Sequence, residues 1–110
     1  MAGVHGREPF SYTVTPLGGR LVVTLRGELD ASTAPEFVPA LLELADGPDL
    51  ILDLRHLTLI DSSGLAALVA GYRRVSEYDG VLALIGVPRF LSRMLALTQL
   101  DRVIPVLDVA

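Results

Sequence analysis

Residues 11–26 alternate between apolar and polar side chains, in two runs that flank a Gly-Gly pair. An alternation with a period of two is typical of β-strands that bury one face. Gly18 and Gly19 supply the positive φ angles that a tight hairpin turn requires. We therefore predict a β-hairpin, and we expect the segment GELD at residues 27–30 to form a loop after it.

Three later segments, residues 32–47, 63–80 and 88–100, carry apolar residues at the spacing of an amphipathic helix. Ser32 or Thr33 can cap the first of these helices, and Pro35 suits its first turn. Pro39 predicts a late start or a kink, because proline has no N–H and clashes with the preceding turn. The faces that we expect to be buried are Phe37, Ala40, Leu41 and Leu44 in the first helix, Leu65, Leu68, Val69, Tyr72 and Val75 in the second, and Phe90, Leu91, Met94, Leu95 and Leu97 in the third.

Two short apolar runs, residues 49–57 and 81–87, show little alternation and predict strands buried on both faces. A loop through residues 56–60 is expected to follow the first of them. Residues 102–110 read as a final extended segment, which Pro105 makes an edge strand or a frayed end. The resulting order ββαβαβαβ predicts an α/β fold whose sheet contains parallel strands.

Composition narrows the class of protein. A length of 110 residues predicts one domain, residues 1–110, with a flexible N-terminus over residues 1–8. The net charge of −4 argues against nucleic acid and anionic membranes as partners. The chain has no cysteine, no apolar core of a secretory signal and no run long enough to span a membrane. We therefore expect a cytoplasmic protein.

Candidate chemistry is concentrated in the stretch IDSSGL, residues 60–65, where a strand is expected to lead into a helix. Ligand sites of α/β sheets lie at the carboxyl ends of strands, and helix N-termini favour anions. One side chain suffices for a helix cap, yet Asp61, Ser62 and Ser63 can all serve. Gly64 in the first turn costs up to ~1 kcal/mol relative to alanine. The turn is therefore either a helix cap alone or a functional site whose glycine allows a close approach to the backbone.

Three functional interpretations of this turn are open. Ser62 as a nucleophile would need a base, for which His56 is the nearest histidine, but the G-x-S-x-G elbow is absent. Asp30, Asp53 and Asp61 could hold a metal, although no tight acidic motif or histidine cluster supports one. Ser62 could instead be a substrate for phosphorylation, because a helix N-terminus favours a charge of about −2 without unfolding the domain.

The helix after the turn could provide a docking surface. Outside its expected core face it carries the small residues Ala66, Ala67, Ala70 and Gly71, followed by Arg73 and Arg74. Small side chains let a partner approach closely, and arginines can pair with acids across an interface. The alternative is that these small residues favour the helix or pack beneath another element of the same chain.

Three quoted segments carry a family resemblance: LRGELDASTAPEF, LILDLRHLTLIDSSGLAALV and LALIGVPRFLSRMLALTQLDRVIPVL. Together they resemble the STAS-domain family of anti-sigma factor antagonists over nearly the whole chain. The resemblance implies a single STAS-like α/β domain with a central mixed sheet of about four to five strands and helices packed on it. It also implies a binding protein rather than an enzyme, with no cofactor.

The resemblance further implies a mechanism and a set of partners. The unphosphorylated antagonist binds an anti-sigma factor, a serine kinase of the GHKL type, and releases the sigma factor. Phosphorylation of Ser62, with Ser63 as the alternate, ends the binding, and a PP2C-type phosphatase restores it. The expected partner-binding residues are Asp30, Asp61, Ser63, Gly64, Ala66 and Arg73.

One departure from the family pattern concerns the last loop, where Gln99-Leu100 stands in place of a frequent glycine–leucine pair. The resemblance also leaves a second function open, because STAS domains serve as interaction subunits in lipid-transport and stress-signalling assemblies. A small serine hydrolase built on His56 and Ser62 is the alternative from a different class.

Overall fold

The structure is a computed structural model that describes residues 9–107. The expected flexible segment 1–8 and the last part of the expected C-terminal strand, residues 108–110, lie outside the described residues. The elements follow in the order β1 (Ser11–Leu17), β2 (Arg20–Leu29), α1 (Ala34–Leu44), β3 (Asp49–Ile60), α2 (Ser62–Glu77), β4 (Leu82–Ile85), α3 (Arg89–Thr98) and a short 3-10 helix (Leu100–Arg102).

The four strands form one mixed sheet in the order β1-β2-β3-β4. β1 and β2 are the predicted antiparallel hairpin, and Gly18 and Gly19 close it with φ angles of 58° and 82°. β3 runs parallel to β2, and β4 runs parallel to β3. Val106 forms a single parallel β-bridge with Leu84. The C-terminal segment therefore lies along the free edge of β4.

Two expected loops are strand instead. Residues 27–29 of the GELD segment belong to β2, and residues 56–60 belong to β3, so both of those predictions were wrong. The β2–β3 ladder shifts its register between Thr24 and Arg26 and again between Gly27 and Glu28. Gly27 has a φ of 89°, which only glycine adopts without strain. These irregularities break the alternation in the sequence, although the backbone pairing continues to the end of both strands.

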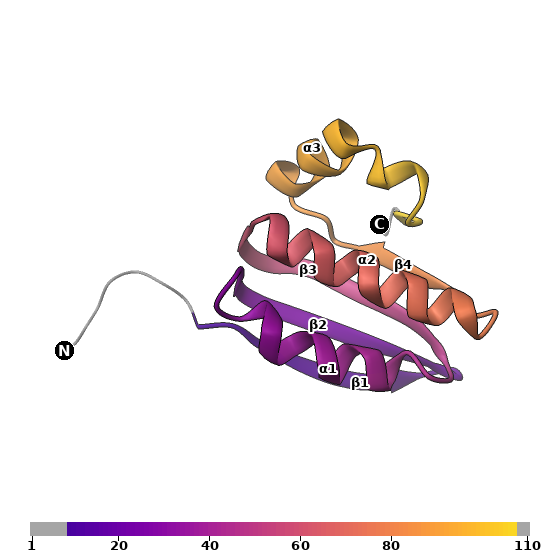
Figure 1. Cartoon of the computed structure of the whole chain (residues 1–110). Coiled ribbons are helices and arrows are strands. Elements are labelled where there is room, and N and C mark those ends of the chain that lie inside the picture. The colour runs from indigo at the N-terminus through magenta and orange to yellow at the C-terminus, as the bar shows by residue number, and fades with distance from the viewer. Residues whose placement is uncertain (1–8, 108–110) are drawn as a thin grey trace.

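Helices α1 and α2 lie side by side over the same face of the sheet (Figure 1). Gly71 lets them pack closely, because a Cβ atom at this position would lie 2.7 Å from Leu41 Cδ2 of α1. An ion pair between Arg74 and Asp46, with Nε and Oδ1 2.6 Å apart, joins the last turn of α2 to the segment that follows α1. Pro39 stands within α1 without ending it, and its side chain is exposed.

The core lies between this helix layer and the sheet. Alternate residues of the two inner strands, β2 and β3, are buried, and they form one hydrophobic cluster with Phe37, Leu41 and Leu68 of the helices. Leu91, Leu95 and Ile104 add α3 and the C-terminal segment to the same cluster. Leu97, expected to be buried, is 86% exposed, so the apolar face of α3 is narrower than predicted.

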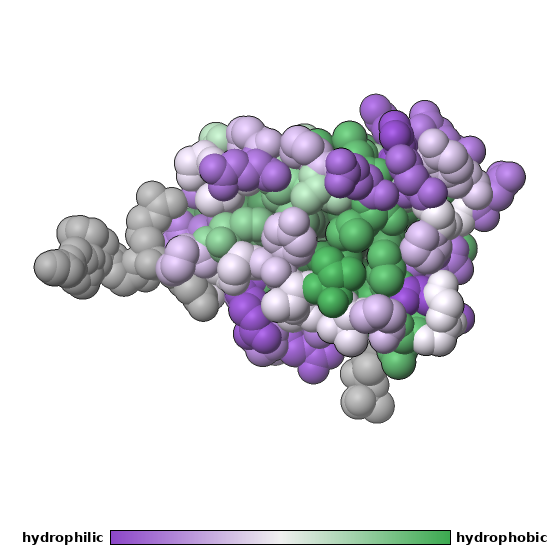
Figure 2. Space-filling view, turned by 90° about the horizontal axis from the view of Figure 1, so that it is seen from below, coloured by the Kyte–Doolittle hydropathy of each residue, from purple (hydrophilic) through white to green (hydrophobic). Residues whose placement is uncertain are grey.

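β1 forms the outer edge of the sheet, and all seven of its residues are exposed. Figure 2 views the molecule from this side and shows apolar side chains in green between hydrophilic ones in purple. The rings of Phe10 and Tyr12 each lie 5.2 Å from the ring of Phe37. Pro16 is tolerated in β1 because an edge strand does not require every N–H for pairing.

Candidate functional site

The carboxyl ends of β2, β3 and β4 point to the same end of the molecule, at the left of Figure 1. The loop from β2 to α1 and the turn from β3 to α2 therefore meet there. They bring together Asp30 with residues 31–33 and Asp61 with residues 62–64. This arrangement is the usual location of a site in a parallel sheet.

Asp61 is the N-cap of α2 and ties the two loops together. Its Oδ1 accepts hydrogen bonds from the backbone N–H groups of Ser63 at 2.9 Å and Gly64 at 3.1 Å. Its Oδ2 accepts a bond of 3.3 Å from the backbone N–H of Ala31, thirty residues earlier in the chain. The cap prediction is thus confirmed for Asp61, and the same side chain also positions the β2–α1 loop.

Ser62 and Ser63 occupy the first turn of α2 but differ in exposure. Ser62 is exposed, whereas Ser63 is partly buried. Within the described residues neither hydroxyl makes a hydrogen bond, because Asp61 provides the cap. Two serine hydroxyls therefore stand at the positive end of a 16-residue helix without a structural role in its cap.

Gly64 packs against the chain itself and not against the solvent. It is buried, and a Cβ atom there would lie 2.5 Å from the carbonyl oxygen of Leu29 and would overlap Ile60 Cγ1. The close approach that the sequence suggested is therefore made by the ends of β2 and β3. Gly64 was expected among the partner-binding residues; in this structure it is buried and packs against the strand ends.

Asp30, expected among the partner-binding residues, is also buried, with 8% of its surface exposed. Its Oδ1 accepts bonds from the Ser32 hydroxyl at 2.7 Å and from the Ser32 N–H at 2.9 Å. Hydrogen bonding, foremost from the Ser32 hydroxyl, holds the pKa of Asp30 below its ordinary value, although burial acts in the opposite direction. The buried carboxylate thus fixes the conformation of the exposed Ala31–Ser32 corner through these hydrogen bonds.

Thr33 is a member of this loop that the sequence identified only as a possible cap. Its hydroxyl donates to the carbonyl of Glu28 at 2.8 Å and accepts from the N–H of Asp30 at 2.9 Å. It stands at the N-cap of α1 but makes no side-chain cap bond. A serine or threonine three residues after an aspartate is a recurrent turn signal, and it could have indicated this network.

The outer face of α2 continues from Ser62 away from the turn. Ala66 and Arg73 are exposed and lie four and eleven residues after Ser62, which places all three on one side of the helix. Within residues 9–107 Arg73 makes no ion pair, whereas Arg74 is bound to Asp46. Ala67 and Gly71 are buried, so half of the expected small-residue surface belongs to the core.

Other sequence candidates are not assembled into a site. His56 is exposed on β3, and roughly 13 Å of extended strand lies between it and Ile60, at the end of β3 next to the turn that carries Ser62. Asp53 pairs with Arg55, its Oδ1 lying 2.9 Å from Nε. Among residues 9–107 no three acidic, histidine or cysteine side chains form a group that could hold a metal ion.

Comparison with known proteins gives the class to which this fold and turn belong. The profile of the family described as "Mlab, STAS domain" matches residues 13–107. This protein belongs to the STAS-domain family, and the predicted α/β fold with a mixed sheet is confirmed. No helix within residues 9–107 is both long enough and apolar enough to cross a membrane.

Relatives named as anti-sigma factor antagonists match most of this chain. The chain is 30% identical over 89 residues to the anti-sigma-B factor antagonist of Listeria monocytogenes, covering 79% of this chain and 78% of the relative. It is 32% identical over 85 residues to the anti-sigma-B factor antagonist of Bacillus subtilis, covering 76% and 78% of the two chains.

Solved structures of anti-sigma factor antagonists share the fold of this chain. An anti-sigma factor antagonist from Mycobacterium paratuberculosis superposes with a TM-score of 0.80 at 28% identity, over 89% of this chain and 85% of that one. The unphosphorylated antagonist SpoIIAA shares the fold, with a TM-score of 0.77 at 16% identity and coverage of 91% and 89%.

Proposed function

We propose that this protein is an anti-sigma factor antagonist whose binding to an anti-sigma factor is switched off by phosphorylation of Ser62. The observation that carries the proposal is the exposed Ser62 hydroxyl at the start of α2, beside a cap made by a different residue. The names of the relatives support the regulatory role, and the partner is proposed from them.

Ser62 is preferred over Ser63 on exposure. A kinase must bring its nucleotide to within bonding distance of the acceptor oxygen, and the exposed hydroxyl of Ser62 is open to such an approach. Ser63 is partly buried, and its backbone N–H is held by Asp61 at 2.9 Å. The Ser63 hydroxyl is therefore less open to a kinase than the Ser62 hydroxyl.

The physical effect of the phosphate would be on binding and not on folding. A phosphoserine carries a charge of about −1.5 to −2 at neutral pH. At the N-terminus of α2 this charge is favoured by the helix dipole. Against a docked partner the same charge would need desolvation without a paired cation, which costs several kcal/mol and lowers affinity by orders of magnitude.

We infer that the partner contacts the face of α2 that carries Ser62, Ala66 and Arg73, together with the Ala31–Ser32 corner. Ala66 allows close approach, and the guanidinium of Arg73 makes no ion pair within residues 9–107. Asp61 and Asp30 hold the two loops in place behind this surface. We propose a GHKL-type serine kinase as the partner and a PP2C-type phosphatase as the enzyme that reverses the modification.

A capture experiment tests the partner. Wild-type protein, Ser62→Asp and Ser63→Asp would serve as baits in lysate of the source organism, with bound proteins identified by mass spectrometry. We expect wild type to retain an anti-sigma factor kinase and Ser62→Asp to lose it. A partner that wild type and Ser62→Asp both retain, such as a membrane ATPase, would support the alternative function, an interaction subunit of another complex. Loss from Ser63→Asp alone would move the switch to Ser63.

A further inference from the structure

A groove lies on the face of the sheet opposite α1 and α2, at the end farthest from Ser62. It has a volume of about 210 Å³ and is lined by Arg20, Asp49, Ile51, Val81, Ala83 and Leu107. Asp49 begins β3 and Ile60 ends it, so about 35 Å of extended strand separates the groove from the α2 turn. The groove is therefore distinct from the site proposed above.

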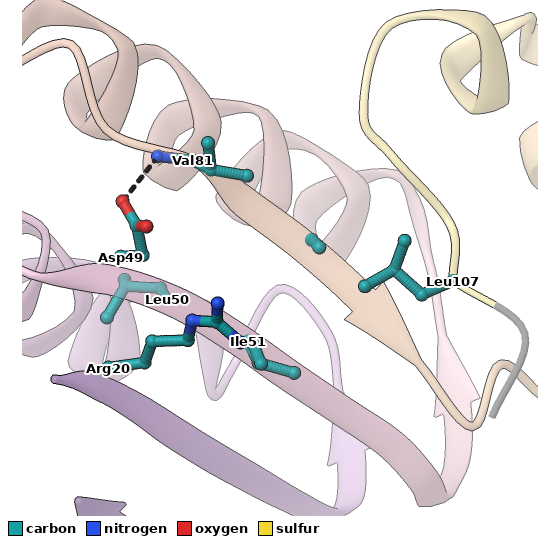
Figure 3. Close-up of a pocket in the computed structure, with 7 residues that line it drawn as sticks. Arg20, Asp49, Leu50, Ile51, Val81 and Leu107 are labelled. Atoms are coloured by element: carbon teal, nitrogen blue, oxygen red, sulfur yellow. Dashed lines mark hydrogen bonds between the residues drawn. The ribbon is translucent and has the colours of Figure 1, made fainter. Parts of the chain in front are cut away.

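The wall of the groove is apolar and comes from three segments. Ile51 of β3 and Ala83 of β4 are register partners, and Leu107 stands beside them at the end of the C-terminal segment. Figure 3 shows Leu107 on the far side of β4 from Ile51. Leu107 is held there by its N–H, which donates to the carbonyl of Leu84 at 2.8 Å. Leu107 is 47% exposed, so apolar surface remains open to a ligand.

The two charged side chains at the groove, Asp49 and Arg20, differ in their hydrogen bonding. Asp49 Oδ1 accepts a hydrogen bond of 2.9 Å from the N–H of Val81, and this bond ties the start of β3 to the start of β4. Within residues 9–107 the side chain of Arg20 makes no hydrogen bond or ion pair, although its backbone pairs with β3 as the register partner of Asp49. In Figure 3 its guanidinium extends along β3 toward Ile51. The groove thus offers one unoccupied cation next to an apolar wall.

We propose that this groove binds a small amphiphilic carboxylate, with its carboxylate on Arg20 and its apolar part on Ile51, Ala83 and Leu107. Sites for drug-sized ligands usually measure about 300–1,000 Å³, so the ligand here must be smaller. The planar guanidinium of arginine matches a carboxylate through two parallel hydrogen bonds. Burial of the apolar part supplies the rest of the affinity.

Titration of the isotope-labelled full chain with hexanoate, followed by amide NMR shifts, tests the proposal. Hexylamine and 1-hexanol share the apolar chain and serve as the cationic and neutral comparisons. We expect hexanoate to shift the amides of Ile51, Ala83 and Leu107 in a saturable way. We expect 1-hexanol to bind about two- to fivefold more weakly, which corresponds to one exposed ion pair.

Two arginine variants show whether the charge on Arg20 is responsible. Arg20→Gln should weaken hexanoate binding about two- to fivefold and leave 1-hexanol unchanged. Arg26→Gln is the matched control, because Arg26 is an exposed arginine on the same strand that does not line the groove; it should change neither. Leu107→Ser should weaken both ligands by removing apolar contact.

Several results would overturn the proposal. Tighter binding of hexylamine than of hexanoate would mean that Asp49 and not Arg20 selects the ligand. Shifts scattered over the surface, or equal losses in Arg20→Gln and Arg26→Gln, would mean that the acid binds without a site. Shifts of the groove amides on dilution without any ligand would mean that a second copy of the chain covers it.

Discussion

Gly64 decides how closely the start of α2 approaches the ends of β2 and β3. We expect Gly64→Ala to lower the free energy of unfolding by about 1–3 kcal/mol, because its Cβ would press on the Leu29 carbonyl and on Ile60. Gly47→Ala is the matched control, since nothing lies within 4 Å of a Cβ there, and its change should be within about 1 kcal/mol. Urea denaturation measures both. Equal effects of the two variants would contradict the packing role of Gly64.

Gln99 takes the conformation that the family's frequent glycine at this position would favour. It ends α3 with a φ of 62°, in the left-handed region. We expect Gln99→Gly to raise the free energy of unfolding by about 0.5–1 kcal/mol, because glycine relieves that strain. Ala96→Gly, at an exposed position inside α3, should lower it by about 1 kcal/mol. If chemical denaturation showed that both glycine variants are less stable than wild type, the positive φ of Gln99 would not be a source of strain.

At the scale of elements, Asp61 links α2 to the β2–α1 loop. Asp61→Ala removes the acceptor for Ser63, Gly64 and Ala31, and we expect it to cost about 1–2 kcal/mol of stability. Asp61→Asn retains an acceptor oxygen and should cost less. Hydrogen exchange should show faster exchange of the Ser63, Gly64 and Ala31 amides in the alanine variant. Unchanged exchange at Ala31 would mean that the link between the loops is not maintained in solution.

The ion pair between α1 and α2 makes their contact dependent on pH. Arg74 holds the pKa of Asp46 below its ordinary value of about 3.9, chiefly through its hydrogen bond. The folded state therefore binds fewer protons here than the unfolded state. This contribution is complete above about pH 4 and is lost as the pH falls through the lowered pKa. Asp46→Asn should weaken the fall in the free energy of unfolding at acid pH, whereas Glu43→Gln, an exposed acid near the end of α1, should not.

The order of elements was predictable because each has a strong local signal: the Gly-Gly turn, the helical spacing and the apolar strands. The ends of β2 and β3 were not, because Gly27 and the register shifts hide a pairing that only the neighbouring strand maintains. The large residues expected on the inner face of α2 do pack on the core, with Leu68 and Val75 fully buried. The sequence left open whether Gly71 faces a partner or packs beneath another element, and the structure places it against Leu41 of α1.

For the candidate site, the sequence identified the turn and its aspartate cap. It could not show that Asp61 also holds Ala31, since that bond joins residues thirty positions apart. Nor could it separate Ser62 from Ser63 on physical grounds, because the difference lies in burial. Nor could the sequence show that the packing of the strand ends buries Asp30 and Gly64, both expected among the partner-binding residues.

At the scale of the whole molecule, the fold separates stability from switching. Ser62 is exposed and Asp61 supplies the cap, so a negative charge at Ser62 should leave the core intact. We expect Ser62→Asp to change the free energy of unfolding by less than about 1 kcal/mol, with stabilisation as the favoured sign. A large loss of stability in denaturant would contradict this separation, because weaker binding would then follow from unfolding.

Release of the proposed anti-sigma factor kinase by ATP would test most directly whether Ser62 is the switch. The complex would be formed with wild-type protein, Ser62→Ala or Ser63→Ala, and dissociation after addition of ATP and magnesium would be followed by size-exclusion chromatography. We predict that wild type and Ser63→Ala dissociate with a phosphate mapped to Ser62, and that Ser62→Ala stays bound. Dissociation of Ser62→Ala at the wild-type rate would contradict the assignment of Ser62 as the switch.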